Sequence, residues 1–407
     1  MRLLPVLACA ALLAASACTS SGAVSSTTRP PSTRPAPHST TVRPSTTRPP
    51  ARTASAPATA TPAPLDPAQR ALARLSLAQR VGQLIMVDCP SSGVTSATAT
   101  AIQRDHAGSV ILDGTSHLGV TGTRAVTDRL RSLAPADPGL FVSTDQEGGL
   151  VQRMQGPGFE TIPSAVDQGA DSPAQIRALT RSWGQELLSA GINVDLAPVL
   201  DTVPPDGRGN PPIGDLDREY GRDPGQVARL GNAVVRGLAD AGVDATVKHF
   251  PGLGRVTGNT DTASGVVDQE TTRDDAYLLP FRRAIANGVP FVMVSTGIYA
   301  RIDPNNIAAF SPTIVTGMLR HDLGFRGVII TDDISAAAQV AGIPPGQRAV
   351  AFVQAGGTML LTVVASIVAP MTAALIDRAH HDPAFRRKVD AAALVVLRAK
   401  QARGLLG

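Results

Sequence analysis

The sequence predicts an α/β fold in which eight parallel strands close into a (β/α)8 barrel of the TIM type. Eight short apolar runs alternate with amphipathic stretches along the chain. Apolar strands that are each followed by a helix are buried on both faces, which indicates a parallel sheet, and a count of eight favours closure. An open doubly wound sheet is the alternative, although it usually has fewer strands. The runs cover residues 84–88, 109–113, 140–145, 192–196, 244–249, 291–295, 328–332 and 358–362.

Helix signals fill the gaps between these runs. Asp66 and Pro67 are typical of an N-cap and a first helical residue, and Ser76 predicts a second short helix that ends at Val81. The closing stretch, residues 386–404, carries one apolar stripe and predicts a helix that covers the last strand. Longer amphipathic segments predict helices at residues 173–190, 224–241, 273–287 and 347–355.

The first 17 residues resemble a bacterial lipoprotein signal peptide. A charged start is followed by an apolar stretch too short to span a membrane, and small residues then precede Cys18. The string Ala15-Ser-Ala-Cys18 resembles a lipobox, although such boxes usually carry Leu where this chain has Ala15. We expect cleavage before Cys18, lipidation of its thiol, and an extracytoplasmic protein anchored to the cell membrane. An ordinary secretory signal, which would release the protein, is the alternative.

Residues 18–65 predict an extended linker, because they are almost entirely Ser, Thr, Pro, Ala and Arg. Six of the 37 basic residues precede Asp66 and none of the 33 acidic residues does, so residues 66–407 carry a net charge of −2. This charge balance gives no argument for binding nucleic acid. Residues 66–407 are expected to form the barrel as a single domain, in which Cys89 is a buried small side chain.

Polar side chains follow four of the predicted strands. The third strand leads into Asp145-Gln-Glu-Gly-Gly-Leu-Val-Gln-Arg153, the fifth ends in Lys248 and His249, and the seventh ends in Asp332. The loop after the fourth strand contributes Arg218. Side chains at strand C-termini point into the mouth of a barrel, so we expect them to meet there. A mouth lined by acids and a few cations suits a small polyhydroxylated ligand.

Each of these residues also has a structural interpretation. Asp332 or Asp145 could cap a helix, Arg218 could pair with an acid of its own loop, and His249 could be a satisfied core histidine. We expect neither a metal nor a cofactor, because the seven histidines are scattered and only His249 lies at a strand end. A Ser–His–Asp triad is also unsupported, since there is no Gly-x-Ser-x-Gly elbow.

Four strings in order resemble the N-terminal domain of glycoside hydrolase family 3, and within it the single-domain β-N-acetylhexosaminidase branch. They are Asp145-Gln-Glu-Gly-Gly, Asn210-Pro-Pro-Ile-Gly-Asp, Lys248-His-Phe-Pro-Gly and Gly327-Val-Ile-Ile-Thr-Asp-Asp. The resemblance covers about residues 75–403, and the Lys-His-Phe-Pro-Gly string is quite specific. It implies a barrel that removes terminal β-linked N-acetylglucosamine, with retention of configuration, from cell-wall fragments such as peptidoglycan or muropeptides.

The resemblance also implies roles for individual residues. Asp332 matches the first acid of the family's Ser/Thr-Asp-Asp motif, so it is expected to be the covalent nucleophile. A retaining glycosidase needs such a carboxylate under the anomeric carbon and an acid/base above it. The positions that hold the hydroxyls of the sugar are matched by Asp145, Arg153, Arg218, Lys248 and His249.

The chain departs from the branch at the acid/base. The branch follows its Lys-His-Phe-Pro-Gly string with His-Gly and then Asp-Ser-His, where the His is the acid/base and the Asp orients it. An ungapped overlay puts Asp261 at that His and Asn259 at that Asp. We expect Asp261 to protonate the leaving oxygen itself, provided that a dry site or the nearby nucleophile keeps it protonated. A barrel that only binds glycan is the alternative, and a sugar transferase or phosphorylase is a third, weaker one.

Overall fold

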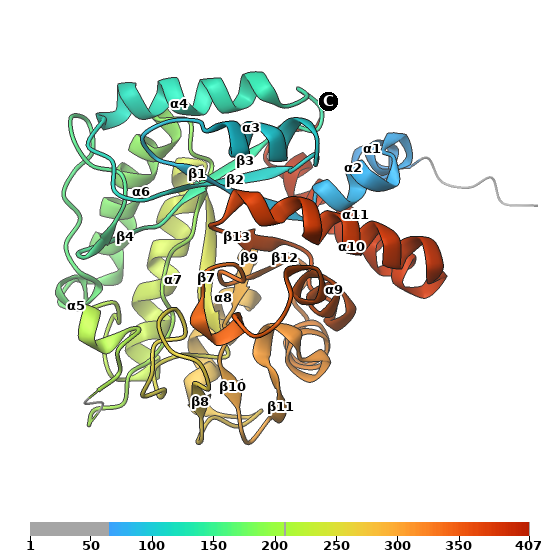
Figure 1. Cartoon of the computed structure of the whole chain (residues 1–407). Helices are drawn as coiled ribbons and strands as arrows, with labels where there is room; N and C mark the ends of the chain where they lie inside the picture. Colours follow the sequence, from blue (N-terminus) through green and yellow to red (C-terminus); the bar gives the residue numbers. More distant parts are fainter. Residues whose placement is uncertain (1–64, 207–208, 407) are drawn as a thin grey trace, which may run out of the picture. The chain divides into compact units, whose positions relative to one another are not determined.

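The computed structural model of the chain describes residues 65–206 and 209–406 (Figure 1). The predicted signal peptide, Cys18 and all of the linker except Leu65 lie outside the described residues. Within the described part, no helix is long and apolar enough to cross a membrane.

Eight parallel strands form the barrel, in the spatial order β12-β9-β7-β6-β3-β2-β1-β13. A parallel bridge between Ile330 and Met359 joins the two ends of this order, so the ring is complete and the open-sheet alternative is wrong. Each strand overlaps one of the eight predicted runs. The strands are β1 (Ile85–Pro90), β2 (Ser109–Asp113), β3 (Phe141–Thr144), β6 (Val194–Asp195), β7 (Asp244–Phe250), β9 (Phe291–Val294), β12 (Val328–Thr331) and β13 (Leu360–Thr362).

Helices precede the first barrel strand, separate the strands along the chain and follow the last one. Both predicted N-terminal caps are confirmed, since Asp66 and Ser76 accept the backbone N–H groups of Gln69 and Gln79 in reciprocal capping boxes. The helices are α1 (Pro67–Arg74), α2 (Leu77–Gly82), α3 (Ser96–Gln103), α4 (Gly119–Leu133), α5 (Ala165–Gln168), α6 (Pro173–Ser189), α7 (Pro224–Ala241), α8 (Leu279–Ala286), a π-helix (Thr313–Asp322), α9 (Pro345–Ala355), α10 (Val368–His381) and α11 (Pro383–Ala402).

Two helix predictions need correction. The helix predicted for residues 273–287 is shorter, because Asp275 accepts the N–H of Tyr277 and starts a single 3-10 turn, after which α8 begins at Leu279. The last helix begins earlier than predicted, because the Asp382 carboxylate caps it at Pro383.

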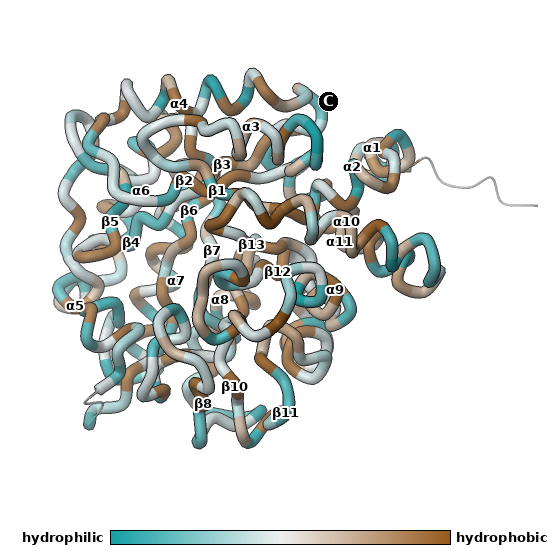
Figure 2. The backbone as a smooth tube through the Cα atoms, viewed as in Figure 1, coloured by the Kyte–Doolittle hydropathy of each residue, from teal (hydrophilic) through white to brown (hydrophobic). Residues whose placement is uncertain are grey.

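The barrel interior is packed with apolar side chains, and hydrophobic residues follow the strands in Figure 2. The rings of Phe141 and Phe291 meet edge to face with centroids 5.4 Å apart. Val396 of α11 belongs to the same cluster. Lys400, one turn further on, donates to the carbonyl of Gly108, just before β2. The prediction that this helix covers the last strand was therefore too limited. The helix α11 also contacts β12 and closes the N-terminal end of the barrel.

Short additions to the barrel carry the polar loops. A hairpin of β4 (Gln146–Gly148) and β5 (Val151–Gln152) follows β3 directly. A second small sheet joins β8 (Val267–Asp268), β10 (Ile298–Tyr299) and β11 (Asp303–Ile307), which Figure 1 shows together below the barrel strands. Since β4 follows β3 and β8 follows β7, both additions lie beyond the C-terminal ends of barrel strands. Cys89 is buried, as predicted.

Candidate active site

The predicted polar residues gather at the C-terminal ends of the strands. Asp145 follows β3 directly, and Asp332 follows β12 directly. Lys248 and His249 are among the last three residues of β7. Arg218 reaches the same end from the loop between β6 and α7. In a barrel of this kind these ends form one mouth, opposite the end that α11 closes.

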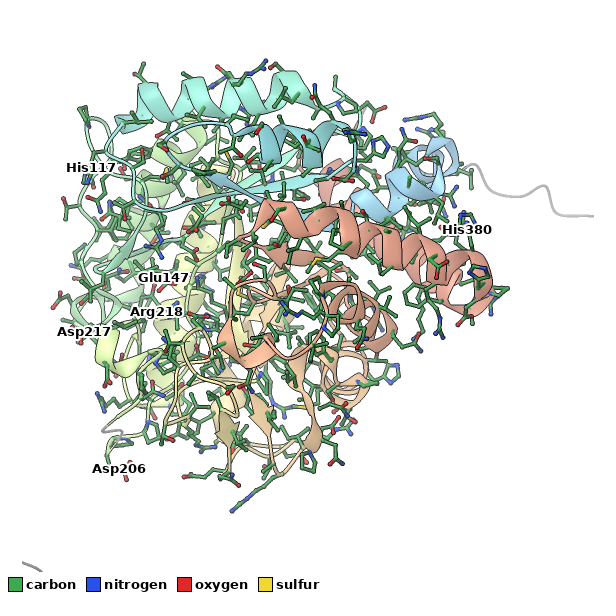
Figure 3. The ribbon with its side chains drawn as sticks, viewed as in Figure 1. His117, Glu147, Asp206, Asp217, Arg218 and His380 are labelled. Atoms are coloured by element: carbon green, nitrogen blue, oxygen red, sulfur yellow. The ribbon has the colours of Figure 1, made fainter. Side chains whose placement is uncertain are left out.

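An ion-pair network joins β3, β7 and the Arg218 loop. The Lys248 ammonium lies 2.5 Å from an Asp145 oxygen and 2.6 Å from a Glu147 oxygen. The Arg218 guanidinium donates two hydrogen bonds to the Glu147 carboxylate, at 2.8 and 2.7 Å, and Figure 3 shows these two side chains close together. Only 2% of the Lys248 side chain and 4% of the Glu147 side chain are exposed, so water screens these charges weakly.

The network fixes the protonation of its members. Burial alone would raise the pKa of the Glu147 carboxyl, but Arg218 and Lys248 hold that pKa well below its usual range. Burial would lower the pKa of the Lys248 amine, but Asp145 and Glu147 raise it above its ordinary value. Glu147 is thus ionised and Lys248 protonated at neutral pH, which leaves fixed donors and acceptors beside the mouth.

Sequence reasoning missed Glu147 as a site residue and misplaced the partner of Arg218. Arg218 pairs with Glu147 of the β4 strand and with none of the acids described in its own loop. A signal was present in Asp145-Gln-Glu, because residues two apart in an extended chain face the same side. Asp145 caps no helix in the described part of the chain, and its partner is Lys248.

His249 is oriented by a second missed acid, Asp201. The His249 Nδ1 lies 2.6 Å from one Asp201 oxygen, and the other oxygen accepts the backbone N–H groups of His249 and Leu253. Asp201 is fully buried and ends a short apolar run that follows β6. The histidine is therefore satisfied at Nδ1, as its structural interpretation required, while its ring is held at the strand end.

Arg153 lies beside Asp145, because its backbone N–H donates to the Asp145 carbonyl at 3.1 Å. Its Nε is buried and has no hydrogen-bond partner within residues 65–206 and 209–406. A buried N–H donor without a partner costs free energy of folding. The Arg153 Nε is therefore placed to donate to an acceptor on a ligand.

Asp332 has the environment expected of a reactive carboxylate. Among the described residues its carboxylate forms no ion pair and has one hydrogen bond, which it accepts from the backbone N–H of Asp333 at 2.9 Å. Burial raises the pKa of Asp332 to about 6, and the negative charge of Asp261 adds to the rise, while His249 and Lys248 oppose it. The charges of these three residues therefore act on the Asp332 carboxyl.

The turn after β12 is shaped by the neighbouring acid, and neither of the next two helices has a side-chain cap. Asp333 accepts the backbone N–H groups of Ser335, Ala336 and Ala337, at 3.0, 2.7 and 3.1 Å, and so shapes the turn after β12. The alternative that Asp332 merely caps the next helix is therefore wrong. Its carboxylate stays available at the mouth.

Asp261 lies in the loop between β7 and β8, with an exposed side chain. Its backbone carbonyl accepts the N–H of Ala338 at 3.0 Å, which attaches the loop to the segment that follows Asp332. The backbone of the Asp261 loop is thus bonded to the chain six residues after Asp332.

Comparison with known proteins identifies the family. Residues 76–399 match the model of the glycosyl hydrolase family 3 N terminal domain. The chain belongs to glycosyl hydrolase family 3. A beta-hexosaminidase of Stenotrophomonas maltophilia (strain R551-3) is 32% identical over 337 residues, which cover 80% of this chain and 92% of that protein.

Solved structures support the same assignment. The crystal structure of a beta-N-acetylhexosaminidase from Beutenbergia cavernae DSM 12333 is 48% identical, with a TM-score of 0.80, and covers 81% of this chain and 99% of its own. A family 3 beta-N-acetylglucosaminidase from Paenibacillus sp. str. FPU-7 is 32% identical with a TM-score of 0.73, covering 81% of this chain and 63% of its own.

This family 3 barrel uses Asn259 differently from the orienting Asp of the branch. The Asn259 side-chain oxygen accepts the backbone N–H of Asp261 at 2.9 Å, and the Asn259 carbonyl accepts the N–H groups of Thr262 and Ala263. Asn259 therefore shapes the turn that presents Asp261. Within the described residues of this family 3 chain, no group of three or more His, Cys, Asp or Glu is arranged to hold a metal ion.

Proposed function

We propose that the chain is a retaining glycosidase that removes terminal β-linked N-acetylglucosamine, or a related β-sugar, from cell-wall-derived glycans such as peptidoglycan or muropeptide fragments. Family membership supports the glycosidase, and the activity named for the Beutenbergia protein supports the sugar. The observation that carries the proposal is the Asp332 carboxylate at the end of β12, which forms no ion pair with a described residue and whose pKa is shifted by the charges of Asp261, His249 and Lys248.

In the proposed first step, the ionised Asp332 attacks the anomeric carbon while Asp261 gives its proton to the leaving oxygen. The bond to the aglycone breaks as the bond to Asp332 forms, which gives a glycosyl ester. In the second step Asp261 takes a proton from water, and that water attacks the anomeric carbon and releases Asp332. Two displacements at one carbon return the original configuration.

The sugar is held, in this proposal, by the network at β3 and β7. Asp145 accepts hydrogen bonds from hydroxyl groups, and Lys248, His249, Arg153 and Arg218 donate to them. Glu147 keeps the two cations Lys248 and Arg218 in place. The alternative of a barrel that only binds glycan is disfavoured by the hydrolytic activities named for the relatives.

The proposed location is the outer side of the cell membrane, with a lipid on Cys18 and residues 19–65 as a spacer. The lipobox-like Ala15-Ser-Ala-Cys18 and the composition of the spacer support it. Mass spectrometry of the mature N-terminus tests it: a diacylated Cys18 is expected in the membrane fraction, and Cys18→Ala should leave that fraction. An unmodified N-terminus in the medium would refute the anchor.

The catalytic assignment is tested with two classes of β-N-acetylglucosaminide, one with an alkyl and one with an aryl leaving group. Asp332→Ala should lower kcat/KM roughly a thousandfold or more on both classes. Asp261→Ala should lower it strongly on alkyl glycosides but little on 2,4-dinitrophenyl glycosides, whose leaving group needs no proton. Azide should then rescue the latter variant with formation of a β-glycosyl azide.

Asp128, an exposed acid on α4, offers the matched control, and Asp128→Ala should behave as the wild type. Full activity of Asp332→Ala would reject the nucleophile. Equal losses for Asp261→Ala on both substrate classes would reject the acid/base.

A further inference from the structure

The loop that presents Asp261 is fastened on two sides. Beneath it, Val256 and Val266 pack with Val199, Val203 and Ile213 in an apolar cluster separate from the barrel core. At its start, the Asn210 side chain donates to the carbonyls of Leu253 and Val256, each at 2.8 Å. These contacts fix the ends of the loop, and between residues 260 and 265 only Ala263 packs against the same cluster.

Gln339 fastens the remaining part. Its side-chain oxygen accepts the Val266 N–H at 2.9 Å, and its side-chain nitrogen donates to the Val266 carbonyl at 3.2 Å. Its backbone N–H donates to the Thr260 carbonyl at 3.1 Å. One residue therefore holds the loop on both sides of Asp261, and only 8% of Gln339 is exposed.

Gln339 also belongs to the chain segment that follows the proposed nucleophile, Asp332. It lies seven residues after Asp332, beyond the turn that Asp333 shapes. The start of the segment follows β12 and is also tied to the end of β13, because Asp333 accepts the Val363 N–H at 3.2 Å. The distance between the two proposed catalytic carboxylates is thus set through Gln339 and its neighbour Ala338, which bonds to the Asp261 carbonyl.

We propose that Gln339 is a positioning residue that holds Asp261 in register with Asp332, so that the acid can reach the leaving oxygen. This inference rests on the proposed function. Proton transfer requires hydrogen-bond reach in the bound complex, so a loosened loop lowers the rate of steps that need the proton. Steps that need only the nucleophile are unaffected.

The test compares Gln339→Ala with wild type on N,N′-diacetylchitobiose and on 2,4-dinitrophenyl β-N-acetylglucosaminide. We expect kcat/KM on chitobiose to fall at least tenfold and kcat/KM on the dinitrophenyl substrate to stay within about twofold, because kcat/KM reports the first step and dinitrophenolate leaves without a proton. In an Asp261→Ala background the same substitution should cause no further loss on chitobiose, because the residue it positions is gone. Gln347→Ala, an exposed glutamine on α9, is the matched control and should leave both substrates unchanged.

A purely structural role would lower both substrates in parallel with the melting temperature, and that result would overturn the proposal. If Gln339→Ala does not fold, Gln339→Glu keeps the acceptor for the Val266 N–H and removes the donor, and it should show a smaller loss confined to chitobiose. Equal rates on chitobiose for this variant and wild type would also overturn it. The proposed function fails separately, through an active Asp332→Ala enzyme.

Discussion

Lys400 should make the stability of the barrel depend on pH in a way that a solvated lysine would not. Its side chain is fully buried at the closed end of the barrel, where it donates to the Gln83 side chain at 2.6 Å and to the Gly108 carbonyl at 2.7 Å. Neither acceptor is charged. Burial lowers the pKa of the amine from 10.5 to about 7.

The sign follows from the two protonation states. Below pH 7 the amine is charged in the folded and in the unfolded chain, and the full cost of burying that charge opposes folding. As pH rises, the folded chain loses the proton first, so the free energy of unfolding increases until the unfolded amine also titrates near 10.5. The shift corresponds to about 5 kcal/mol in all and to roughly 2 kcal/mol between pH 7 and pH 9.

Lys400→Met isolates this effect. The substitution removes the cost of burying the charge but leaves two buried oxygens without a donor, at about 1–3 kcal/mol each, so two opposing effects determine the stability at any one pH. The pH slope is the informative quantity. Urea unfolding followed by circular dichroism from pH 6 to pH 9 should show wild type gaining roughly 2 kcal/mol relative to Lys400→Met.

Lys388 on the same helix provides the matched control, because its ammonium group bonds to the Gln354 carbonyl at the surface. Lys388→Met should follow the wild-type pH slope. Parallel curves for wild type and Lys400→Met would show that the buried amine keeps an ordinary affinity for protons, and the reasoning would be refuted.

Three further predictions concern the mouth of the barrel. Glu147→Gln should raise KM and lower the free energy of unfolding by about 3–5 kcal/mol, because it leaves Arg218 without a carboxylate, and urea unfolding with steady-state kinetics measures both; an unchanged KM would contradict the role of Glu147. Burial raises the pKa of Asp195 to about 8, so it is neutral at pH 7 and Asp195→Asn should keep wild-type activity, whereas Asp195→Ala removes the acceptor of the Gln146 N–H and should destabilise the enzyme in thermal melts. Because the pKa of Asp332 is raised to about 6 and the nucleophile must be ionised, kcat/KM should fall about tenfold per pH unit below that value, and a flat profile down to pH 4.5 would argue against this nucleophile.

Local sequence signals were sufficient for the barrel. Each of its strands is an apolar run bounded by polar residues, and burial on both faces leaves that pattern little ambiguity. Even β6, which pairs only through Val194 and Asp195, was found from its flanking apolar residues. The helix errors arose at the starts of α8 and α11, where the Asp275 and Asp382 caps decide the first residue and periodicity does not.

The site was harder to predict, because its contacts join residues far apart in the chain. Asp332, Lys248 and Asp145 were found because each ends a strand of the barrel. Glu147 and Asp201 were missed because each pairing depends on a loop between β6 and α7, which supplies Arg218 to Glu147 and Asp201 to His249. No periodicity in the sequence encodes those loop positions.

The most direct test of the account is to trap the intermediate on Asp332. Incubation with 5-fluoro-N-acetylglucosaminyl β-fluoride should add one sugar to the protein, because the fluorine slows hydrolysis of the glycosyl ester. Peptide mass spectrometry should find the added mass on Asp332, and Asp332→Ala should gain none. A label on any other residue, or turnover without a covalent adduct, would contradict the account.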